Sequence, residues 1–166
     1  MWSPDRPASA GRRAILVALG LGLAGCGFVP AYGPGGAGAA LRGRVALPVP
    51  ETPFDYRLRA ALEDRLGRAD DAAYQLGLAT TQSRAPAAMA ADGSLMRTTL
   101  TGTSHLRLID QVTRALLTEA TVTALAAYST TGTTVATAAA ASDAEARLAV
   151  LLADQIMSRL LLSLPQ

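Results

Sequence analysis

An apolar stretch near the N-terminus decides how much of this chain can contribute to a fold. Residues 14–24 contain only Ala, Ile, Leu, Val and Gly. They are far fewer than the roughly 20 residues that a membrane-spanning helix needs. Arg6, Arg12 and Arg13 precede them and supply the positive start that is typical of a signal peptide. We therefore expect residues 1–25 to be removed on export; a short membrane anchor is the alternative.

The stretch ends in Leu23-Ala24-Gly25-Cys26, which resembles the lipobox of bacterial lipoproteins. The resemblance implies cleavage before Cys26 and attachment of lipid to its thiol, including palmitate-type acyl chains. Arg12-Arg13 leaves twin-arginine export open beside the general secretory route. Gly27 stands where an Asp would resemble an inner-membrane retention signal. We therefore expect a lipid-anchored protein of the cell outer membrane that faces the periplasm.

Cys26 is the only cysteine, so no disulfide can stabilise the exported chain. Stability must come from packing, and the residues that follow the cleavage site suffice for one domain with a hydrophobic core. Residues 26–40 are mostly Gly, Ala and Pro, which predicts a flexible tether. The expected organisation is a signal peptide at 1–25, a lipidated Cys and tether at 26–40, and a single α/β sandwich domain at 41–166.

The net charge of +2 belongs to the signal peptide. Residues 1–25 hold three arginines and one aspartate, so their removal leaves equal numbers of basic and acidic residues. This balance argues against a nucleic-acid partner. All the basic residues are arginines, whose planar guanidinium groups suit carboxylate or phosphate.

In the first half of the domain, the pattern predicts a strand, a helix and a second strand. Residues 41–47 alternate loosely and end before prolines, which is typical of a short strand. A helix follows, with Thr52 as its N-cap, Pro53 at its first position and Gly67 as its end. Its buried stripe is predicted to be Phe54, Leu58, Ala61, Leu62 and Leu66. Residues 74–81 then alternate as a half-buried strand.

Two further strands are predicted after a loop at 85–94. The inward face of the third strand is predicted to hold Leu100, Gly102, Ser104, Leu106 and Leu108. Its outward face is predicted to hold Thr99, Thr101, Thr103, His105 and Arg107. Asp110-Gln111 is the predicted hairpin turn. The fourth strand is predicted to point inward with Val122, Ala124, Ala126 and Tyr128.

The C-terminal helix has a clear apolar stripe but two candidate starts. Its stripe is Leu148, Leu152, Ile156 and Leu160. Ser142-Asp143-Ala144-Glu145 has the pattern of a capping box, which would begin the helix there. An alanine-rich helix could instead begin near Val135, so residues 130–141 are compatible with a loop or a helix.

The element order is therefore β-α-β-β-β-α. We expect an α+β fold, a two-layer sandwich in which a four-stranded sheet carries both helices on one face. We expect the other face, which is rich in threonine, to lie outside the core and to stay polar.

The sequence pattern does not bring together the residue types that catalysis and metal binding need. His105 is the only histidine and lies in a run of outward threonines without an evident nucleophile. Glu63-Asp64 and Asp70-Asp71 are adjacent pairs, and adjacent residues do not face each other on a helix. The sequence has no His and Cys cluster for a metal. We expect no enzyme activity, no catalytic residue, no metal and no cofactor.

Three arginines are the candidate ligand-binding residues. Arg97 and Arg107 are an even number of residues apart, so an unbulged strand puts them on one face. The predicted hairpin brings Arg114 back beside Arg107. Clustered guanidinium groups on a polar face could hold phosphate or carboxylate groups. The alternative is that these arginines are solubilising charges that pair with Glu119 or Asp110.

Several segments share a family resemblance in their order and spacing. The segment Cys26-Gly27-Phe28-Val29-Pro30-Ala31-Tyr32 begins at the lipobox cysteine, and residues 57–66 lie in the first helix. Residues 128–137, 143–144 and 152–156 lie near the C-terminus. Together they resemble the LptE family of lipopolysaccharide-assembly lipoproteins. The sequence departs from that family in its lack of lysine and in the alanine-rich segment 136–141.

The resemblance implies an α/β sandwich that plugs a large outer-membrane β-barrel, LptD, and assists insertion of lipopolysaccharide into the outer leaflet. It also implies that basic residues contact lipopolysaccharide, for which Arg97, Arg107 and Arg114 are the candidates. Two other functions stay open. One is an adaptor subunit of another envelope transport machine, and the other is a small periplasmic hydrolase, which the missing catalytic residues disfavour. Co-purification with the barrel would distinguish the plug from the adaptor.

Overall fold

The computed structural model describes residues 36–163, and residues 1–35 and 164–166 lie outside the described part. The expectations for the signal peptide and for Cys26 therefore fall outside it. In chain order the elements are α2 (Ala37–Leu41), β1 (Val45–Ala46), α3 (Pro53–Leu66), β2 (Tyr74–Met89), β3 (Leu95–Asp110), β4 (Leu116–Ser129) and α4 (Thr134–Ser163). This order confirms the predicted α+β fold.

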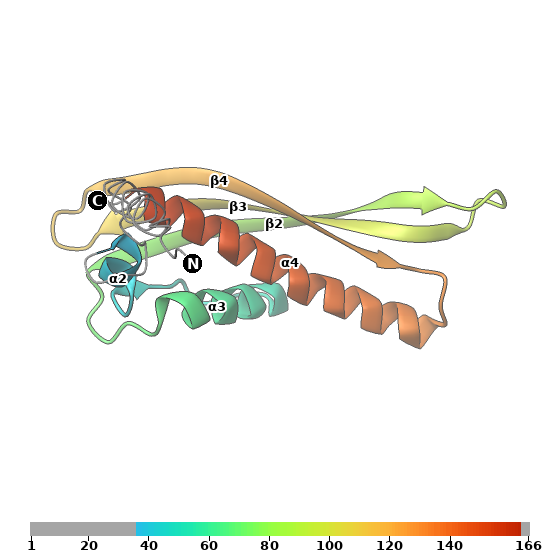
Figure 1. The fold of residues 1–166 in the computed structure, drawn as a ribbon, viewed down its shortest axis with the longest axis horizontal. Coiled ribbons are helices and arrows are strands. Elements are labelled where there is room, and N and C mark those ends of the chain that lie inside the picture. The colour runs from blue at the N-terminus through green and yellow to red at the C-terminus, as the bar shows by residue number, and fades with distance from the viewer. Residues whose placement is uncertain (1–35, 164–166) are drawn as a thin grey trace, which may run out of the picture. The chain divides into compact units, whose positions relative to one another are not determined.

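The four strands form one sheet in the order β1-β2-β3-β4 (Figure 1). β1 runs parallel to β2, and β2, β3 and β4 form the expected antiparallel meander. β2 pairs with β3 from Tyr74↔Asp110 to Met89↔Leu95, so residues 85–89 belong to a strand. The predicted loop at 85–94 was therefore too long. Cross-strand pairing here outweighs the weak intrinsic strand preference of Ala and Pro.

The helix α3 has the caps that the sequence predicts. The Asp55 amide donates to Thr52 Oγ1 at 3.1 Å, and the Thr52 amide donates to Asp55 Oδ2 at 3.0 Å. This reciprocal capping box satisfies two amides that the first turn leaves without helical partners. Gly67 ends the helix with φ at 74°, a backbone conformation that favours glycine. The buried residues are those of the predicted stripe, Phe54, Leu58, Ala61, Leu62 and Leu66.

The helix α4 begins at Thr134, so the earlier of its two candidate starts is confirmed and the start at Ser142 is wrong. Thr133 Oγ1 accepts a hydrogen bond from the Ala136 amide at 3.3 Å, as an N-cap does. Ser142 lies inside the helix, and its hydroxyl accepts a hydrogen bond from Arg57 of α3. Alanine's high helix propensity lets α4 run through this segment without a break. Within residues 36–163, no helix has both the length and the apolarity to cross a membrane.

Both long helices lie on one face of the sheet, as predicted (Figure 1). α4 packs against β3 and β4, and α3 packs beside α4. Leu152 and Ile156 are fully buried in a core that they share with the inward residues of the sheet. α4 crosses β3 at Gly102, where an added Cβ would stand 2.8 Å from Cδ1 of Leu152. The absence of a side chain at Gly102 therefore sets how closely α4 approaches the sheet.

The start of the domain differs from the prediction. Residues 37–41 form the short helix α2, and Leu41 is fully buried. The packed fold therefore begins inside the segment that was expected to be tether. β1 contains two residues, where the sequence predicted a strand over 41–47. The prolines at 48 and 50 oppose its extension, because proline lacks the N–H that a neighbouring strand needs.

Candidate functional site

The face of the sheet opposite the helices is polar and rich in threonine. Thr81, Thr103 and Thr123 stand side by side across β2, β3 and β4. The hydroxyl oxygens of Thr103 and Thr123 are 3.3 Å apart. In neighbouring rows the same face carries the short side chains of Ala79, Ser83, Ala85, Thr99, Thr101 and Thr121. Leu125, which is 60% exposed, stands opposite Thr101 on the same side. We call this surface the threonine face; hydroxyls and short side chains make up most of it, with one exposed leucine among them.

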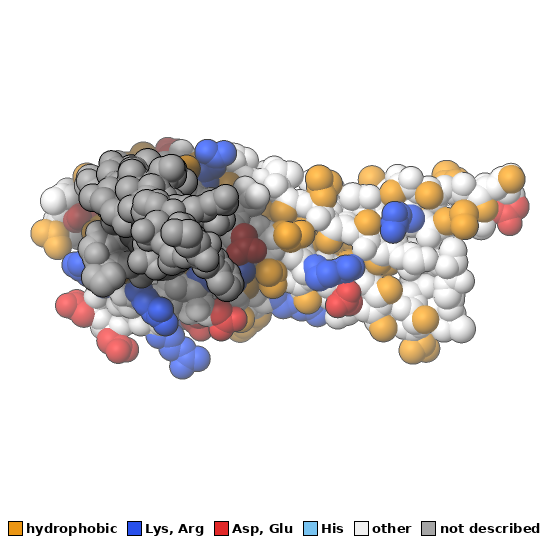
Figure 2. Space-filling view, in the orientation of Figure 1, with side chains coloured by type: hydrophobic (Ala, Val, Ile, Leu, Met, Phe, Trp, Pro, Cys, Tyr) orange, Lys and Arg blue, Asp and Glu red, His pale blue; other side chains and the backbone are white. Residues whose placement is uncertain are grey.

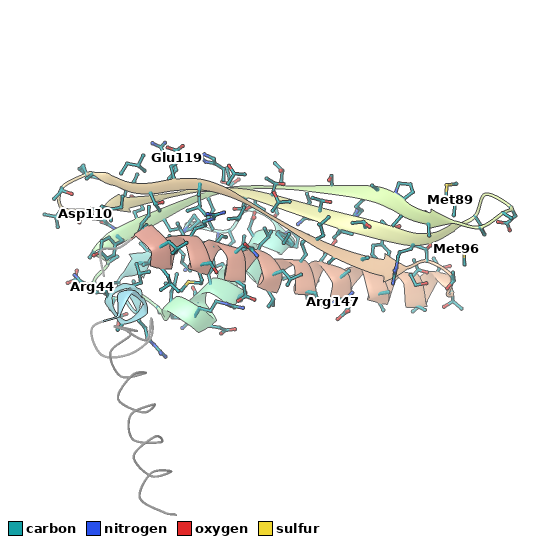
Figure 3. All side chains as sticks on the ribbon, turned by 45° about the horizontal axis from the view of Figure 1, so that its top comes forward. Arg44, Met89, Met96, Asp110, Glu119 and Arg147 are labelled. Carbon is teal, nitrogen blue, oxygen red and sulfur yellow. The ribbon has the colours of Figure 1, made fainter. Side chains whose placement is uncertain are left out.

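The threonine face lies outside the core, as the sequence predicted. Thr101 and Thr103 are half-buried among their strand neighbours, and His105 is exposed. Figure 3 shows side chains rising from this side of the sheet, with Glu119 among them and α4 on the opposite side. The face is therefore available to a partner.

A small charged group borders the threonine face. Glu119 of β4 stands opposite Arg107 of β3. His105 Nε2 lies 3.1 Å from one oxygen of Glu119, and Arg107 Nε lies 3.8 Å from the other. All three side chains are exposed, and exposed pairs of this kind contribute about 0–1 kcal/mol. The contact of Arg107 with Glu119 agrees with the alternative interpretation, in which the arginines are solubilising charges that pair with nearby acids.

The structure does not bring the three candidate arginines together. Arg97 and Arg107 share a face, as predicted, but ten residues of strand put them about 33 Å apart. Arg114 lies in the β3–β4 turn, with φ at 61°, rather than opposite Arg107. Its amide donates to the Asp110 carbonyl at 3.0 Å, about 10 Å along the strand from Arg107. The predicted single cluster of three guanidinium groups is therefore wrong.

Asp110 shapes this turn instead of pairing with an arginine. Its carboxylate accepts hydrogen bonds from the amides of Val112 and Thr113, both at 2.8 Å. The Thr113 amide is the main cause that holds the pKa of Asp110 below its ordinary value, and the Val112 amide adds to it. The turn at Asp110 was predicted from the sequence, and its position is confirmed.

An exposed apolar tip on the β2–β3 hairpin was missed by the sequence analysis. Met89, Leu95 and Met96 are 62%, 38% and 42% exposed, and Met89 pairs with Leu95 across the hairpin. Figure 3 labels the two methionines at this tip, and Figure 2 shows few charged side chains on this end of the sheet. The missed signal was Asp92-Gly93, one of the dipeptides that most strongly favour a hairpin turn.

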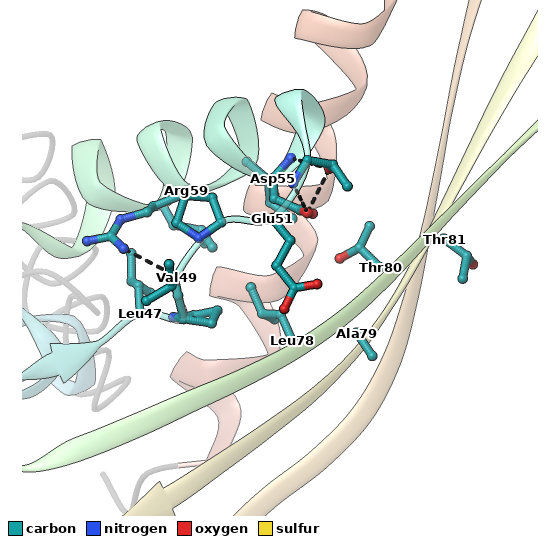
Figure 4. Close-up of a pocket in the computed structure, with 14 residues that line it drawn as sticks. Leu47, Val49, Glu51, Asp55, Arg59, Leu78, Ala79, Thr80 and Thr81 are labelled. Carbon is teal, nitrogen blue, oxygen red and sulfur yellow. Dashed lines mark hydrogen bonds between the residues drawn. The ribbon is translucent and has the colours of Figure 1, made fainter.

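A cleft of about 410 Å³ was also missed. It lies between residues 47–52, the start of α3 and the middle of β2 (Figure 4). Leu58, Leu62 and Leu78 contribute its apolar lining, and Glu51, Asp55 and Arg59 its charges. Local sequence carries no signal for this cleft, because the cleft forms where residues 47–52 diverge from β2, a strand that begins some 25 residues later.

Among residues 36–163, no group of three or more His, Cys, Asp and Glu side chains is placed to hold a metal ion. Three features of the described domain are candidate binding surfaces: the threonine face, the apolar hairpin tip and the cleft beside β2.

The comparison with protein families decides which family this is. Residues 43–160 match the LptE family, whose description is lipopolysaccharide assembly. The chain belongs to the LptE family. It therefore has a general role in lipopolysaccharide assembly, and the LptE family is a non-enzymatic one. No protein with a curated description matches the sequence.

Solved structures share the fold of this LptE-family domain. A putative lipoprotein from Caulobacter crescentus CB15 has a TM-score of 0.63 and 24% identity, covering 76% of this chain and 93% of that one. A minor lipoprotein from Acinetobacter baumannii has a TM-score of 0.53 and 18% identity, covering 72% and 89%. The rare lipoprotein B from Shewanella oneidensis has a TM-score of 0.53 and 14% identity, covering 69% and 89%.

Proposed function

We propose that this LptE-family chain is an outer-membrane lipoprotein that plugs the lumen of an LptD-like β-barrel and assists lipopolysaccharide assembly in the outer leaflet. The observation that carries the proposal is the threonine face. Large membrane barrels have polar, water-filled interiors. A surface composed mainly of hydroxyls and short side chains can lie against such a wall while its own polar groups and those of the wall remain solvated.

Attachment to the membrane is part of the same proposal. Cys26, in its lipobox-like context, carries the lipid, and Gly27 permits transfer to the outer membrane, where the domain faces the periplasm. One acyl chain binds a membrane only marginally, whereas the several chains of a mature lipoprotein anchor it stably. Replacing Cys26 with Ala should abolish incorporation of labelled palmitate; persistent labelling would refute the lipidation site.

Contact with lipopolysaccharide is proposed through Arg97, Arg107 and Arg114 as separate points rather than as one site. Guanidinium groups bind phosphate with two donors, and the lipid A and core regions carry phosphates. Arg97 and Arg114 are the stronger candidates, because no ion pair involves either of them among residues 36–163. Arg107 must compete with its contact to Glu119.

The deciding experiment is purification of the tagged full chain from envelope membranes. We expect an LptD-like barrel to co-purify in a stable complex. A Thr103→Trp variant should reduce that association, because a large ring would stand above the threonine face. Val135→Trp, at a residue of α4 that is 81% exposed and lies outside both that face and the cleft, is the matched control. Recovery of the wild-type chain with a different transport machine would favour the adaptor function instead.

A further inference from the structure

Among residues 36–163, part of the backbone edge of β2 beside the cleft has no strand partner. At the start of β2, the Tyr74 amide donates to the Arg44 carbonyl at 3.0 Å, on the side of β1. Backbone groups in a strand alternate in direction, so those of Leu78, Thr80 and Gln82 point to the same side as those of Tyr74. β1 ends at Ala46, well before it could reach them.

The chain that follows β1 does not replace the missing strand. Pro48 and Pro50 lie in it and lack backbone donors. Among the residues that the structure describes, no hydrogen bond joins the amides of Leu78, Thr80 or Gln82 to residues 47–52. The cleft occupies the space between them, and a second cavity, which shares Thr52, Asp55 and Thr80 with it, lies along Gln82 and Glu145.

Other parts of the sheet edges are protected, which sets this segment apart. Arg147 of α4 donates to the Ala127 carbonyl at 3.1 Å on the edge of β4. Farther along β2, Arg84 pairs with Glu145 at 2.7 Å. Pro86, two residues on, has no N–H to offer at the edge. Proteins commonly block exposed edges with such charges and prolines, and residues 78–82 carry neither.

The charges in the cleft favour a basic occupant. The carboxylate of Asp55 accepts a hydrogen bond from the Thr52 amide. The guanidinium group of Arg59 donates to Glu63 and to the Pro48 carbonyl. Glu51 lines the cleft without an ion pair among residues 36–163. In Figure 4 its carboxylate extends from the loop toward Leu78 and Thr80. A positive side chain in the cleft would therefore find one uncommitted carboxylate.

We propose that this cleft receives an extended segment of the barrel partner, which adds to β2 as a new edge strand. Main-chain hydrogen bonds to Leu78, Thr80 and Gln82 would supply affinity, and alternate side chains would supply specificity. One side chain, small and apolar, would face Leu58 and Leu78, and a neighbouring Arg or Lys would meet Glu51. The inference rests on the proposed function, since the barrel is the partner that supplies the strand.

Amide hydrogen exchange tests the new strand directly. Exchange is measured residue by residue on the full chain alone and in its purified complex with the barrel. We expect the amides of Leu78, Thr80 and Gln82 to exchange at least about tenfold more slowly in the complex. Those of Ala79 and Thr81 already bond to β3 and serve as internal controls. A complex in which the three edge amides exchange as fast as in the free chain would overturn this inference alone.

Charge reversal tests the side-chain preference. Glu51→Arg should weaken association with the barrel about tenfold. Asp71→Arg, at an exposed acid outside the cleft, should leave it unchanged and is the matched control. Equal effects of the two variants would contradict the proposed contact with Glu51. If no barrel co-purifies with the wild-type chain, the proposed function fails and the strand addition fails with it. Self-association of the free chain through protected edge amides would also overturn the proposal.

Discussion

Arg57 of α3 and Glu145 of α4 form an ion pair across 88 residues of sequence, with Nη1 and Oε2 3.0 Å apart. Arg57 also donates to the Ser142 carbonyl at 2.9 Å and to the Ser142 hydroxyl at 3.0 Å. Arg84 of β2 reaches the other oxygen of Glu145. Glu145 therefore links two helices and a strand at the side of the domain where β2 leaves the core.

Removal of this link should destabilise the domain. We expect Arg57→Ala to lower the free energy of unfolding by about 1–2 kcal/mol, because it removes several charge-assisted hydrogen bonds at a partly exposed site. Urea denaturation followed by circular dichroism measures the change. Arg68→Ala is the control, since its side chain is 87% exposed and lies 3.6 Å from Glu63. An equal loss in both variants would contradict the importance of Arg57.

The core should be sensitive at Ile156. This side chain is fully buried beneath the sheet. We expect Ile156→Ala to cost about 2–5 kcal/mol of unfolding free energy, since it removes buried methyl groups and leaves a cavity. Leu162→Ala, at a residue that is 74% exposed on the same helix, should change stability by less than about 0.5 kcal/mol. Denaturant titration of the two variants side by side measures both free energies of unfolding, and equal losses would contradict the assignment of Ile156 to the core.

The close crossing of α4 over β3 should depend on Gly102. We expect Gly102→Ala to cost about 1–3 kcal/mol, because the new Cβ would overlap with Leu152. A second substitution, Leu152→Val, shortens the obstructing side chain. The double variant should therefore lose less stability than the sum of the two single losses. Strict additivity in thermal or chemical unfolding would show that the two side chains do not meet.

The Asp110 turn should make stability depend on pH. The native pKa of Asp110 is lowered, so its carboxylate contributes stability above the unfolded pKa, near 3.9. That contribution is lost as the pH falls through the lower native pKa. We expect Asp110→Asn to be less stable than wild type at pH 7, and the difference to shrink below about pH 4. Unfolding measured across pH 2.5–7 checks this, and a difference that stays constant over the range would contradict it.

The separation of Arg97 and Arg107 makes a prediction about lipopolysaccharide binding. If each arginine binds phosphate by itself, the free-energy losses from Arg97→Ala and Arg107→Ala should add within about 0.5 kcal/mol. A single cluster would give strong coupling. Charge removal at Arg107 and Arg114 together should weaken binding while the fold and barrel association persist. Unchanged binding at physiological salt in all three variants would place the ligand site elsewhere.

Elements with local signals were predicted most closely. The N-cap at Thr52, the end at Gly67 and the five-residue stripe of α3 all depend on residues within a few turns of one another. The alternation in β3 likewise assigned Leu106 to the core and His105 to the other face. The capping-box pattern at Ser142 misled, because the same short pattern also fits the interior of a longer helix.

The sequence by itself determined the periodic faces, the two ends of α3 and the hairpin at Asp110, because these features depend on neighbours along the chain. Only the tertiary structure decided the length of β2, the separation of the arginines and the cleft beside Glu51. Pairing with β3 extends β2 through alanines that would not form a strand alone. Strand geometry separates two arginines that share a face, and the early end of β1 leaves part of the β2 edge without a strand partner in the described part of the chain. Each of these outcomes depends on segments that meet in space and lie far apart in sequence.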